Sequence, residues 1–209
     1  MDSLDWRALP ALPRDFYTRT DVVQVAKDLL GKLVVSRTPE GICGGRIVET
    51  EAYRAPDDKA CHAHGNKRTR RTETMFATGG TAYVYLIYGM YDMLNVVTGP
   101  AEQAQAVLIR ALEPVVGIEL MQTRRKLAKP GPRLTNGPGI LCRALAVTRA
   151  HDGTDLTATD GSLFLLDAPS VDADQIVASP RVNVDYAGEC AAWPWRFREA
   201  GNRYTSPAK

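Results

Sequence analysis

Residues 81–113 read TAYVYLIYGMYDMLNVVTGPAEQAQAVLIRALE, and this stretch decides the fold class. Aromatic and β-branched side chains dominate three runs within it, as is typical of strands. The glycines between the runs indicate turns. The three predicted strands are 81–89, 93–98 and 105–113. Because such closely spaced strands leave no room for crossover helices, we expect them to pair antiparallel.

The rest of the chain surrounds these strands with further strands and a few helices. A helix is expected over 20–30, with Thr20 as its N-cap and Gly31 as its stop. Two more helices are expected over 114–128 and from Asn136 to 147, the second with Pro138 in its first turn. The other predicted strands are 32–36, 45–53, 162–166, 181–184 and 195–199. Strands grouped around helices, without a β-α-β rhythm, predict an α+β fold with a mostly antiparallel sheet.

Length and composition predict one globular domain over residues 1–209, with irregular ends at 1–14 and 201–209. The hydrophobic share is 44%, and no apolar run approaches the eighteen or so residues that cross a membrane. The acidic, proline-interrupted start does not resemble a secretory signal, so we expect a cytoplasmic protein without a membrane partner. The four cysteines form no C-x-x-C pair, and we expect them to be reduced and buried.

Charge is unevenly distributed along the chain although the net charge is only +2. The segments 59–71 and 121–135 are rich in Lys and Arg and contain no acid. In contrast, 151–175 contains six Asp and neither Lys nor Arg. This separation suits a protein that binds a polyanion on one face. The alternative is that each run is an ordinary solvated surface.

Two glutamates in RIVETEAY (46–53) are the first candidates for a catalytic residue. Glu49 and Glu51 are two residues apart, so in a continuous strand they face the same side. A partly buried carboxylate at a strand end has its pKa raised towards the range of a general base. The alternative is a pair of solvent-facing glutamates on an edge strand, and the pattern does not choose between the two residues.

A cluster of aromatic residues and a basic loop are the second and third candidate parts of a functional site. Tyr88 stands beside Gly89 at an expected turn, where an aromatic side chain can protrude as a wedge into stacked bases. Tyr83 and Tyr85 share a strand face and are equally compatible with a core. His62 precedes a basic loop whose cations suit phosphate contacts: Lys67, Arg68, Arg70 and Arg71. Only three histidines occur in the chain, so neither a metal site nor a cofactor is expected.

Several motifs, in order and spacing, resemble the alkyladenine (3-methyladenine) DNA glycosylase family, as a bacterial-type member. They are RIVETEAY, His62, Met75-Phe76, YVYLIYGMY (83–91), Asn95, VLIRALEP (107–114), NGPGILCRAL (136–145) and RVNVDYAGE (181–189). The resemblance extends from about residue 15 to 200. It implies a single-domain α+β fold with a curved antiparallel sheet flanked by helices. It also implies a monomer that acts on damaged double-stranded DNA without a cofactor.

The resemblance implies a role for each matching residue. Glu51, rather than Glu49, is the carboxylate that activates water, and Tyr88 intercalates into DNA. Tyr53 and Tyr85 sandwich the flipped base while His62 closes the other side. Asn95 disfavours a guanine amino group. Arg110 and the carbonyl of Val182 hold the water near the carboxylate.

The reaction implied is base excision without strand cleavage, on alkylated and also deaminated or etheno purines, which leaves an abasic site. His64 and Asn183 depart from the family pattern, which puts phosphate contacts and damage preference in doubt but not the reaction. The residues alone also suit a non-enzymatic nucleic-acid-binding module or a small-nucleoside hydrolase. No residue is an obvious proton donor to the leaving base.

Overall fold

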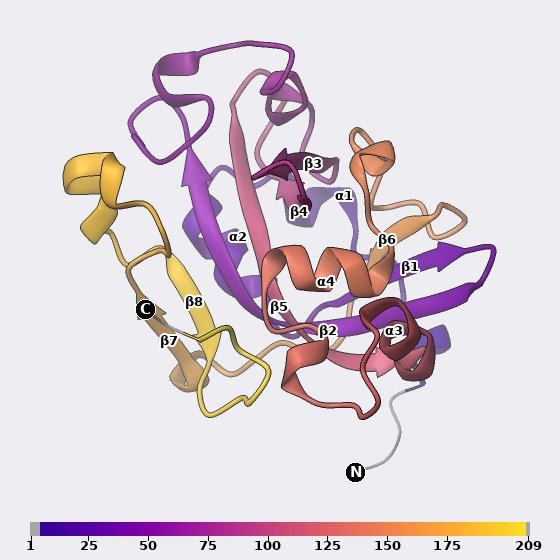
Figure 1. Ribbon diagram of the computed structural model, residues 1–209. Coiled ribbons are helices and arrows are strands. Elements are labelled where there is room, and N and C mark those ends of the chain that lie inside the picture. Colours follow the sequence, from indigo (N-terminus) through magenta and orange to yellow (C-terminus); the bar gives the residue numbers. More distant parts are fainter. Residues whose placement is uncertain (1–4, 208–209) are drawn as a thin grey trace.

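The computed structural model describes residues 5–207, in which eight strands form one sheet. The strands are β1 Leu33–Thr38, β2 Gly41–Arg54, β3 Ala82–Ile87, β4 Tyr91–Val97, β5 Gln105–Val116, β6 Leu163–Leu166, β7 Ile176–Ser179 and β8 Arg196–Glu199. Their order is β3-β4-β5-β2-β1-β6, and β8 joins both β2 and β7. All of these described pairings are antiparallel, which confirms the expected fold class. Register shifts in the β2–β5 pairing accompany the bend of both long strands in Figure 1.

Short helices flank the sheet (Figure 1). The α-helices are α1 Arg14–Tyr17, α2 Val22–Asp28, α3 Ile118–Arg125 and α4 Pro138–Leu145. The 3-10 helices are η1 Trp6–Ala8, η2 His64–Asn66, η3 Glu73–Phe76, η4 Pro132–Leu134, η5 Arg149–His151, η6 Ala173–Gln175 and η7 Asp185–Ala192. No helix of residues 5–207 has the length and apolar character to span a membrane.

Two expected helices start later than predicted. The N-cap of α2 is Asp21, whose carboxylate accepts from the Gln24 amide, so the assignment of Thr20 as the cap was wrong. The helix expected from 114 begins at Ile118, because β5 continues to Val116 and pairs there with Gly44. Gly117 then takes a left-handed conformation (φ 68°) that ends the strand and starts α3. The prediction for α4, with Pro138 in its first turn, is confirmed.

The predicted strand at 181–184 is wrong, and a real strand lies just before it. The residues 176–179 form β7, which pairs with β8. The segment 181–184 is instead a loop, in which Asn183 has a φ of 59° that a strand does not tolerate. The alternation of apolar and polar residues in RVNV is typical of a strand. Hydrogen bonds from Arg181 to the distant Asp58 hold this segment as a loop instead.

The chain ends are only partly irregular. Residues 1–4 and 208–209 lie outside the described residues. Within the N-terminal stretch, η1 forms a short turn and Ala11 makes an isolated bridge to Leu166 of β6. Residues 201–207 contain no helix or strand, as expected, yet Ser206 is only 7% exposed. The four cysteines are free and buried, as predicted.

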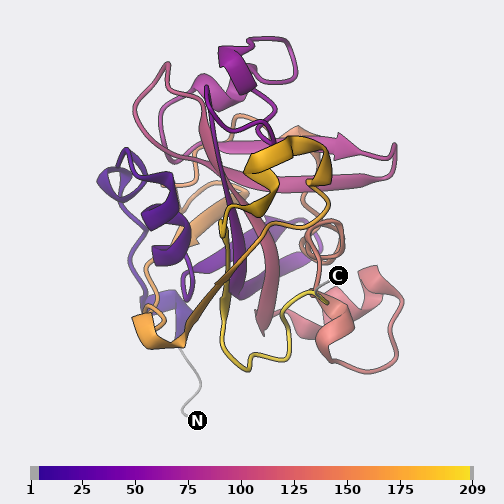
Figure 2. The same cartoon turned by 90° about the vertical axis from the view of Figure 1, so that its left-hand side faces the viewer.

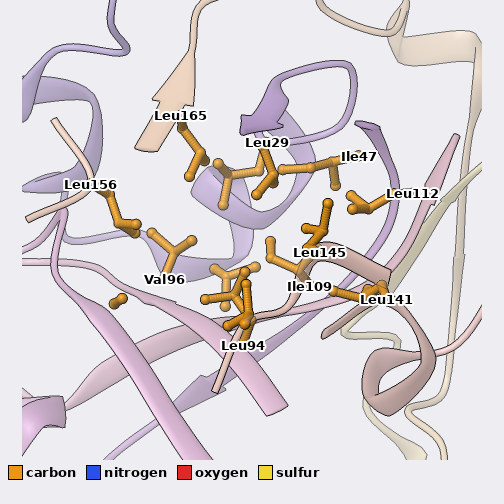
Figure 3. Close-up of a cluster of buried hydrophobic side chains, with 14 of the residues drawn as sticks. Leu29, Ile47, Leu94, Val96, Ile109, Leu112, Leu141, Leu145, Leu156 and Leu165 are labelled. Atoms are coloured by element: carbon orange, nitrogen blue, oxygen red, sulfur yellow. The ribbon is translucent and has the colours of Figure 1, made fainter. Parts of the chain in front are cut away.

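Strand alternation separates a hydrophobic core from a second, more polar face. Figure 3 shows part of that core, where side chains from strands and helices converge. Its labelled residues are Leu29, Ile47, Leu94, Val96, Ile109, Leu112, Leu141, Leu145, Leu156 and Leu165. Burying such side chains stabilises each by roughly 1.5–3 kcal/mol relative to exposure. In β3, β4 and β5, the residues that alternate with core residues such as Val84, Leu94 and Ile109 point to the opposite face.

One row of residues crosses four strands on that opposite face. Tyr83 of β3 pairs with Asn95 of β4, and Asn95 pairs with Leu108 of β5. Leu108 in turn pairs with Glu51 of β2. Paired residues in a sheet project to the same side, so the fold places a phenol, an amide and a carboxylate on one face, with Leu108 between the amide and the carboxylate. The candidate site is built on this row.

Candidate active site

A cavity of about 280 Å³ lies over this row. It is lined by Glu51, Tyr53, Ala60, His62, Met75, Tyr83, Tyr85, Ile87, Tyr88, Met93, Asn95, Ala106, Leu108, Arg110, Pro138, Val182, Asn183, Val184 and Tyr186. All the residues predicted for catalysis, base recognition and intercalation are therefore brought to one place. A mostly apolar and aromatic cavity with a few converging polar groups is the usual form of a binding site for a small planar ligand.

Glu51 is the carboxylate of the cavity, and its side chain is fully buried. Its Oε1 accepts a hydrogen bond from the Val182 amide at 2.8 Å, and its Oε2 accepts one from the Tyr53 hydroxyl at 2.8 Å. Arg110 Nη1 lies 3.3 Å from Oε2. A carboxylate offers roughly four acceptor positions, so these two hydrogen bonds leave acceptor positions on both oxygens where a water can bind. The alternative of a solvent-facing glutamate is excluded.

Glu49 is also buried but belongs to a different set of contacts. Its Oε1 accepts from Arg110 Nε at 2.8 Å and from Arg196 Nε at 2.7 Å. Burial raises the pKa of Glu49, yet the charge of Arg110 and hydrogen bonds from Ser206 hold that pKa below its usual value. Glu49 is absent from the cavity lining. Of the two glutamates that the pattern could not separate, only Glu51 can therefore meet a ligand in the cavity.

The loop at 181–184 is fixed by a buried ion pair that the sequence did not reveal. Arg181 donates two hydrogen bonds to Asp58, at 2.5 and 2.8 Å, and both side chains are fully buried. Its guanidinium also stacks 4.7 Å from the Tyr53 ring. Val182 follows directly and presents its amide to Glu51. Asp58 and Arg181 are 123 residues apart, and no local pattern signals their contact.

His62, Tyr83 and Tyr85 form one wall of the cavity. The rings of His62 and Tyr85 meet edge to face with centroids 4.6 Å apart. A base inserted between two rings needs them about 7 Å apart, so His62 and Tyr85 cannot lie on opposite sides of a base. His62 Nδ1 lies 3.0 Å from the Tyr83 hydroxyl. The sequence left open whether Tyr83 belongs to the core or to the site. Its side chain is only 2% exposed and lines the cavity.

Burial and charge keep this wall neutral. Burial, aided by the nearby charge of Arg71, lowers the pKa of His62 from 6.5 to about 4. Burial also raises the pKa of Tyr85 to about 12. The wall is therefore uncharged over the whole physiological range of pH.

Asn95 stands in the middle of the row with its amide group held in place. Its Nδ2 donates to the carbonyls of Tyr83 at 3.1 Å and Met93 at 3.3 Å. The residue is 3% exposed, so it has little room to move. An amide fixed in this way limits which substituents of a ligand fit beside it.

Tyr88 lies at the tip of the hairpin formed by β3 and β4, which projects from the body of the molecule in Figure 2. Three residues, Tyr88 to Met90, connect the paired Ile87 and Tyr91, and both Tyr88 (φ 53°) and Gly89 (φ 68°) have the positive φ of a tight turn, which the Met90 amide closes by donating to the Ile87 carbonyl. The Tyr88 side chain is 75% exposed, and Met90 beside it is 67% exposed. An apolar tip of this kind beside a cavity is typical of a surface that contacts a partner.

The predicted basic loop lies beside the aromatic wall, and its four cations are not equivalent. Arg68 is paired with both Glu73 and Glu102, at 2.7 and 2.6 Å. Arg71 leans over the Tyr85 ring at 5.1 Å, with Nη2 3.4 Å from His62 Nε2. Lys67 and Arg70 are exposed and form no ion pair within residues 5–207. The part of the chain that the structure describes contains no cluster of three possible metal ligands.

The geometry thus combines a buried carboxylate, a neutral aromatic wall and a projecting hairpin next to cations, as in proteins that process single bases of a nucleic acid. A family model described as methylpurine-DNA glycosylase matches residues 15–203. Three relatives have names that contain the words 3-methyladenine DNA glycosylase.

The relative from Methanocella arvoryzae is 51% identical over 189 residues, which are 90% of this chain and 92% of that protein. The one from Bdellovibrio bacteriovorus is 47% identical over 89% of this chain and 93% of its own. The one from Bacillus licheniformis is 44% identical over 93% and 96%. The chain therefore belongs to the methylpurine-DNA glycosylase family. It is a DNA glycosylase, a hydrolase that acts on the N-glycosidic bond.

Proposed function

We propose that this enzyme flips a damaged purine out of duplex DNA into the cavity and cuts its sugar–base bond with a water activated by Glu51. The single observation that carries the proposal is the Glu51 carboxylate, which is fully buried in an aromatic cavity, accepts one hydrogen bond on each oxygen and keeps acceptor positions for a water. A base inside a duplex cannot reach such a group, so extrusion has to precede the reaction.

Tyr88 is the group that assists extrusion. Unstacking a base costs roughly a few kcal/mol, and less when the base is damaged or mispaired. A 75% exposed tyrosine at a hairpin tip can fill the vacated space and offset part of that cost. Lys67 and Arg70 hold the phosphates in this proposal, which their exposure and positive charge support.

The aromatic residues select what enters. The flipped base stacks on the wall of His62 and Tyr85, with Tyr53 as a further stacking surface of the cavity. Such stacking contributes about 1–3 kcal/mol per base. Because Asn95 is held by two carbonyls, it cannot move aside for the exocyclic amino group of guanine.

Bond cleavage develops positive charge on the sugar, as in glycoside hydrolysis. The Glu51 carboxylate stabilises that charge and takes a proton from the attacking water. Arg110 and the Val182 amide keep the carboxylate in one orientation. The bond from the Val182 amide brings this residue next to the carboxylate, and the Val182 carbonyl remains the proposed partner of the water.

The leaving base has no evident proton donor in the cavity. A His62 with a pKa of about 4 is neutral at pH 7, and burial raises the pKa of Tyr85 to about 12. Purines alkylated on N3 or N7 are already cationic and leave without protonation. We therefore propose alkylated purines as the main substrates, with hypoxanthine and ethenoadenine as slower ones.

The proposed reaction ends at an abasic site. Strand cleavage by a glycosylase needs an amine that forms an imine with the sugar. No lysine is among the residues of the described chain that line the cavity. The site is complete within one chain, so we propose that the enzyme acts as a monomer.

Incubation with a damaged duplex, without heat or alkali, tests the proposal. We expect release of the free base and an intact strand that breaks only after alkali. Strand nicking without alkali would contradict base excision alone. Binding without base release would favour a nucleic-acid-binding module, and hydrolysis of free nucleosides at a comparable rate would favour a nucleoside hydrolase.

A further inference from the structure

We propose that Ser206 is a positioning residue for catalysis, which acts through Glu49 and Arg110 on the Glu51 carboxylate. This inference rests on the proposed role of Glu51. Ser206 lies outside every motif on which the family resemblance depends, and it is absent from the cavity lining.

Ser206 bonds to Glu49 through both its backbone and its side chain. Its amide donates to Glu49 Oε2 at 2.5 Å, and its hydroxyl donates to Glu49 Oε1 at 2.7 Å. The two residues are 157 positions apart, and both are buried. These two hydrogen bonds to the Glu49 carboxylate hold the segment after β8 against β2.

The same hydroxyl accepts from two arginines. Arg110 Nη2 lies 3.2 Å from Ser206 Oγ, and Arg196 Nη2 lies 3.4 Å from it. A hydroxyl has one donor and two acceptor positions, so all of them are used here. Each contact is between an ionised group and a neutral one in a buried setting, where geometry is held more tightly than in water.

Arg110 connects this cluster to the cavity. Its Nε and Nη2 face Glu49 and Ser206, while Nη1 faces Glu51 at 3.3 Å. The guanidinium is planar, so fixing two of its nitrogens fixes the direction of the third. Ser206 thereby fixes the position of the Arg110 guanidinium relative to the Glu51 carboxylate, which activates water in the proposed function.

A short turn over residues 202–205 positions Ser206 beside Glu49 and Arg110. The Asn202 side chain accepts from the Tyr204 amide at 2.9 Å, and its Nδ2 donates to Glu199 at 2.7 Å. The Thr205 hydroxyl donates only to the Asn202 carbonyl, at 3.0 Å. Thr205 is therefore a matched control next to Ser206, with no side-chain hydrogen bond to Arg110 or Arg196 among residues 5–207.

The test compares Ser206→Ala, Ser206→Thr and Thr205→Ala in the full chain with wild type. Single-turnover excision and the Kd for a damaged duplex are measured well below the melting temperature of each variant. For Ser206→Ala we expect the excision rate to fall roughly tenfold to a hundredfold, the size of a small misplacement of a reacting group. The Kd should stay unchanged, because Ser206 does not line the cavity. Ser206→Thr restores the hydroxyl and should recover most of the rate, while Thr205→Ala should match wild type.

A wild-type rate in Ser206→Ala would overturn the proposal, as would equal losses of rate and binding that Ser206→Thr does not rescue. If Ser206→Ala fails to fold, Ser206→Cys keeps the size with a weaker donor, and it should show a reduced rate at an unchanged Kd. Glu51→Gln separates the two proposals. If Glu51→Gln is inactive while Ser206→Ala is fully active, only the role of Ser206 fails. If Glu51→Gln is active, the proposed function fails.

Discussion

The hydroxyl of Tyr53 donates a 2.8 Å hydrogen bond to Glu51, two residues earlier on the same strand. Tyr53 therefore both lines the cavity and orients the carboxylate within it. The Arg181 guanidinium supports the ring at 4.7 Å. In the proposed function, this one side chain couples base recognition to water activation.

Tyr53→Phe separates these two contributions. The ring remains, but the carboxylate loses one of its two hydrogen-bond donors, and a hydrogen bond to a charged group contributes about 1.5–3 kcal/mol. We expect single-turnover excision to fall roughly tenfold or more with little change in Kd. Tyr17→Phe is the control, because the buried Tyr17 hydroxyl has no partner within the described chain. A Tyr53→Phe enzyme as fast as wild type would show that this bond is dispensable.

Tyr88→Ser tests the hairpin tip. Losing an aromatic stacking partner costs about 1–3 kcal/mol, so affinity for a damaged duplex should fall roughly fivefold to a hundredfold. The free energy of unfolding should change by less than about 0.5 kcal/mol, since the side chain is 75% exposed. Val177→Ser removes another exposed hydrophobic residue, on β7, and should leave DNA affinity unchanged. Unfolding of Tyr88→Ser would instead place Tyr88 in a structural role.

His62 predicts a pH dependence of stability. Its pKa is about 4 in the folded protein and 6.5 in an unfolded chain. The unfolded state therefore binds the proton first, so stability is complete above pH 6.5 and is lost as the pH falls towards 4. Urea unfolding at pH 7.5 and 4.5 should show wild type losing on the order of 2 kcal/mol more than His62→Gln over this interval, after allowance for the ring's partial exposure. Equal losses in the two proteins would contradict the assignment.

We expect Arg70→Ala and Arg68→Ala to change the salt dependence of DNA binding by different amounts. Each phosphate contact adds about 0.9 to the slope of log K against log salt. Arg70 has no ion pair within residues 5–207, so Arg70→Ala should reduce the slope by roughly that amount. Arg68 is already paired with Glu73 and Glu102, and Arg68→Ala should change the slope less. Kd measured over a salt series checks this, and equal changes would mean that the pairs of Arg68 open on DNA.

The fold class and the first candidates of the site could be predicted from local pattern, whereas Tyr53, Asn95, Arg110 and Val182 were implied only by the family resemblance. Strand alternation placed Tyr83 and Tyr85 on one face, and the spacing of Glu49 and Glu51 placed both on one side of β2. These inferences need only the period of a strand. The choice between the two glutamates needed the family resemblance, and the buried network explains it, because Glu49 is saturated by donors.

What the sequence could not reveal depends on contacts between distant residues. The segment 181–184 has the alternation of a strand, but the bonds of Arg181 to Asp58 hold it as a loop. Ser206 lies in the stretch 201–209 that was expected to be irregular, yet it is 7% exposed and bonded to Glu49. Partners more than a hundred residues apart leave no trace in local periodicity.

Glu51→Gln is the measurement that tests the central claim most directly. The substitution keeps the size of the side chain but removes the charge and the ability to take a proton from water. Binding and base release are followed together on a duplex that contains ethenoadenine. We expect the wild-type Kd and no detectable release of free base. Full excision activity in Glu51→Gln would contradict the account.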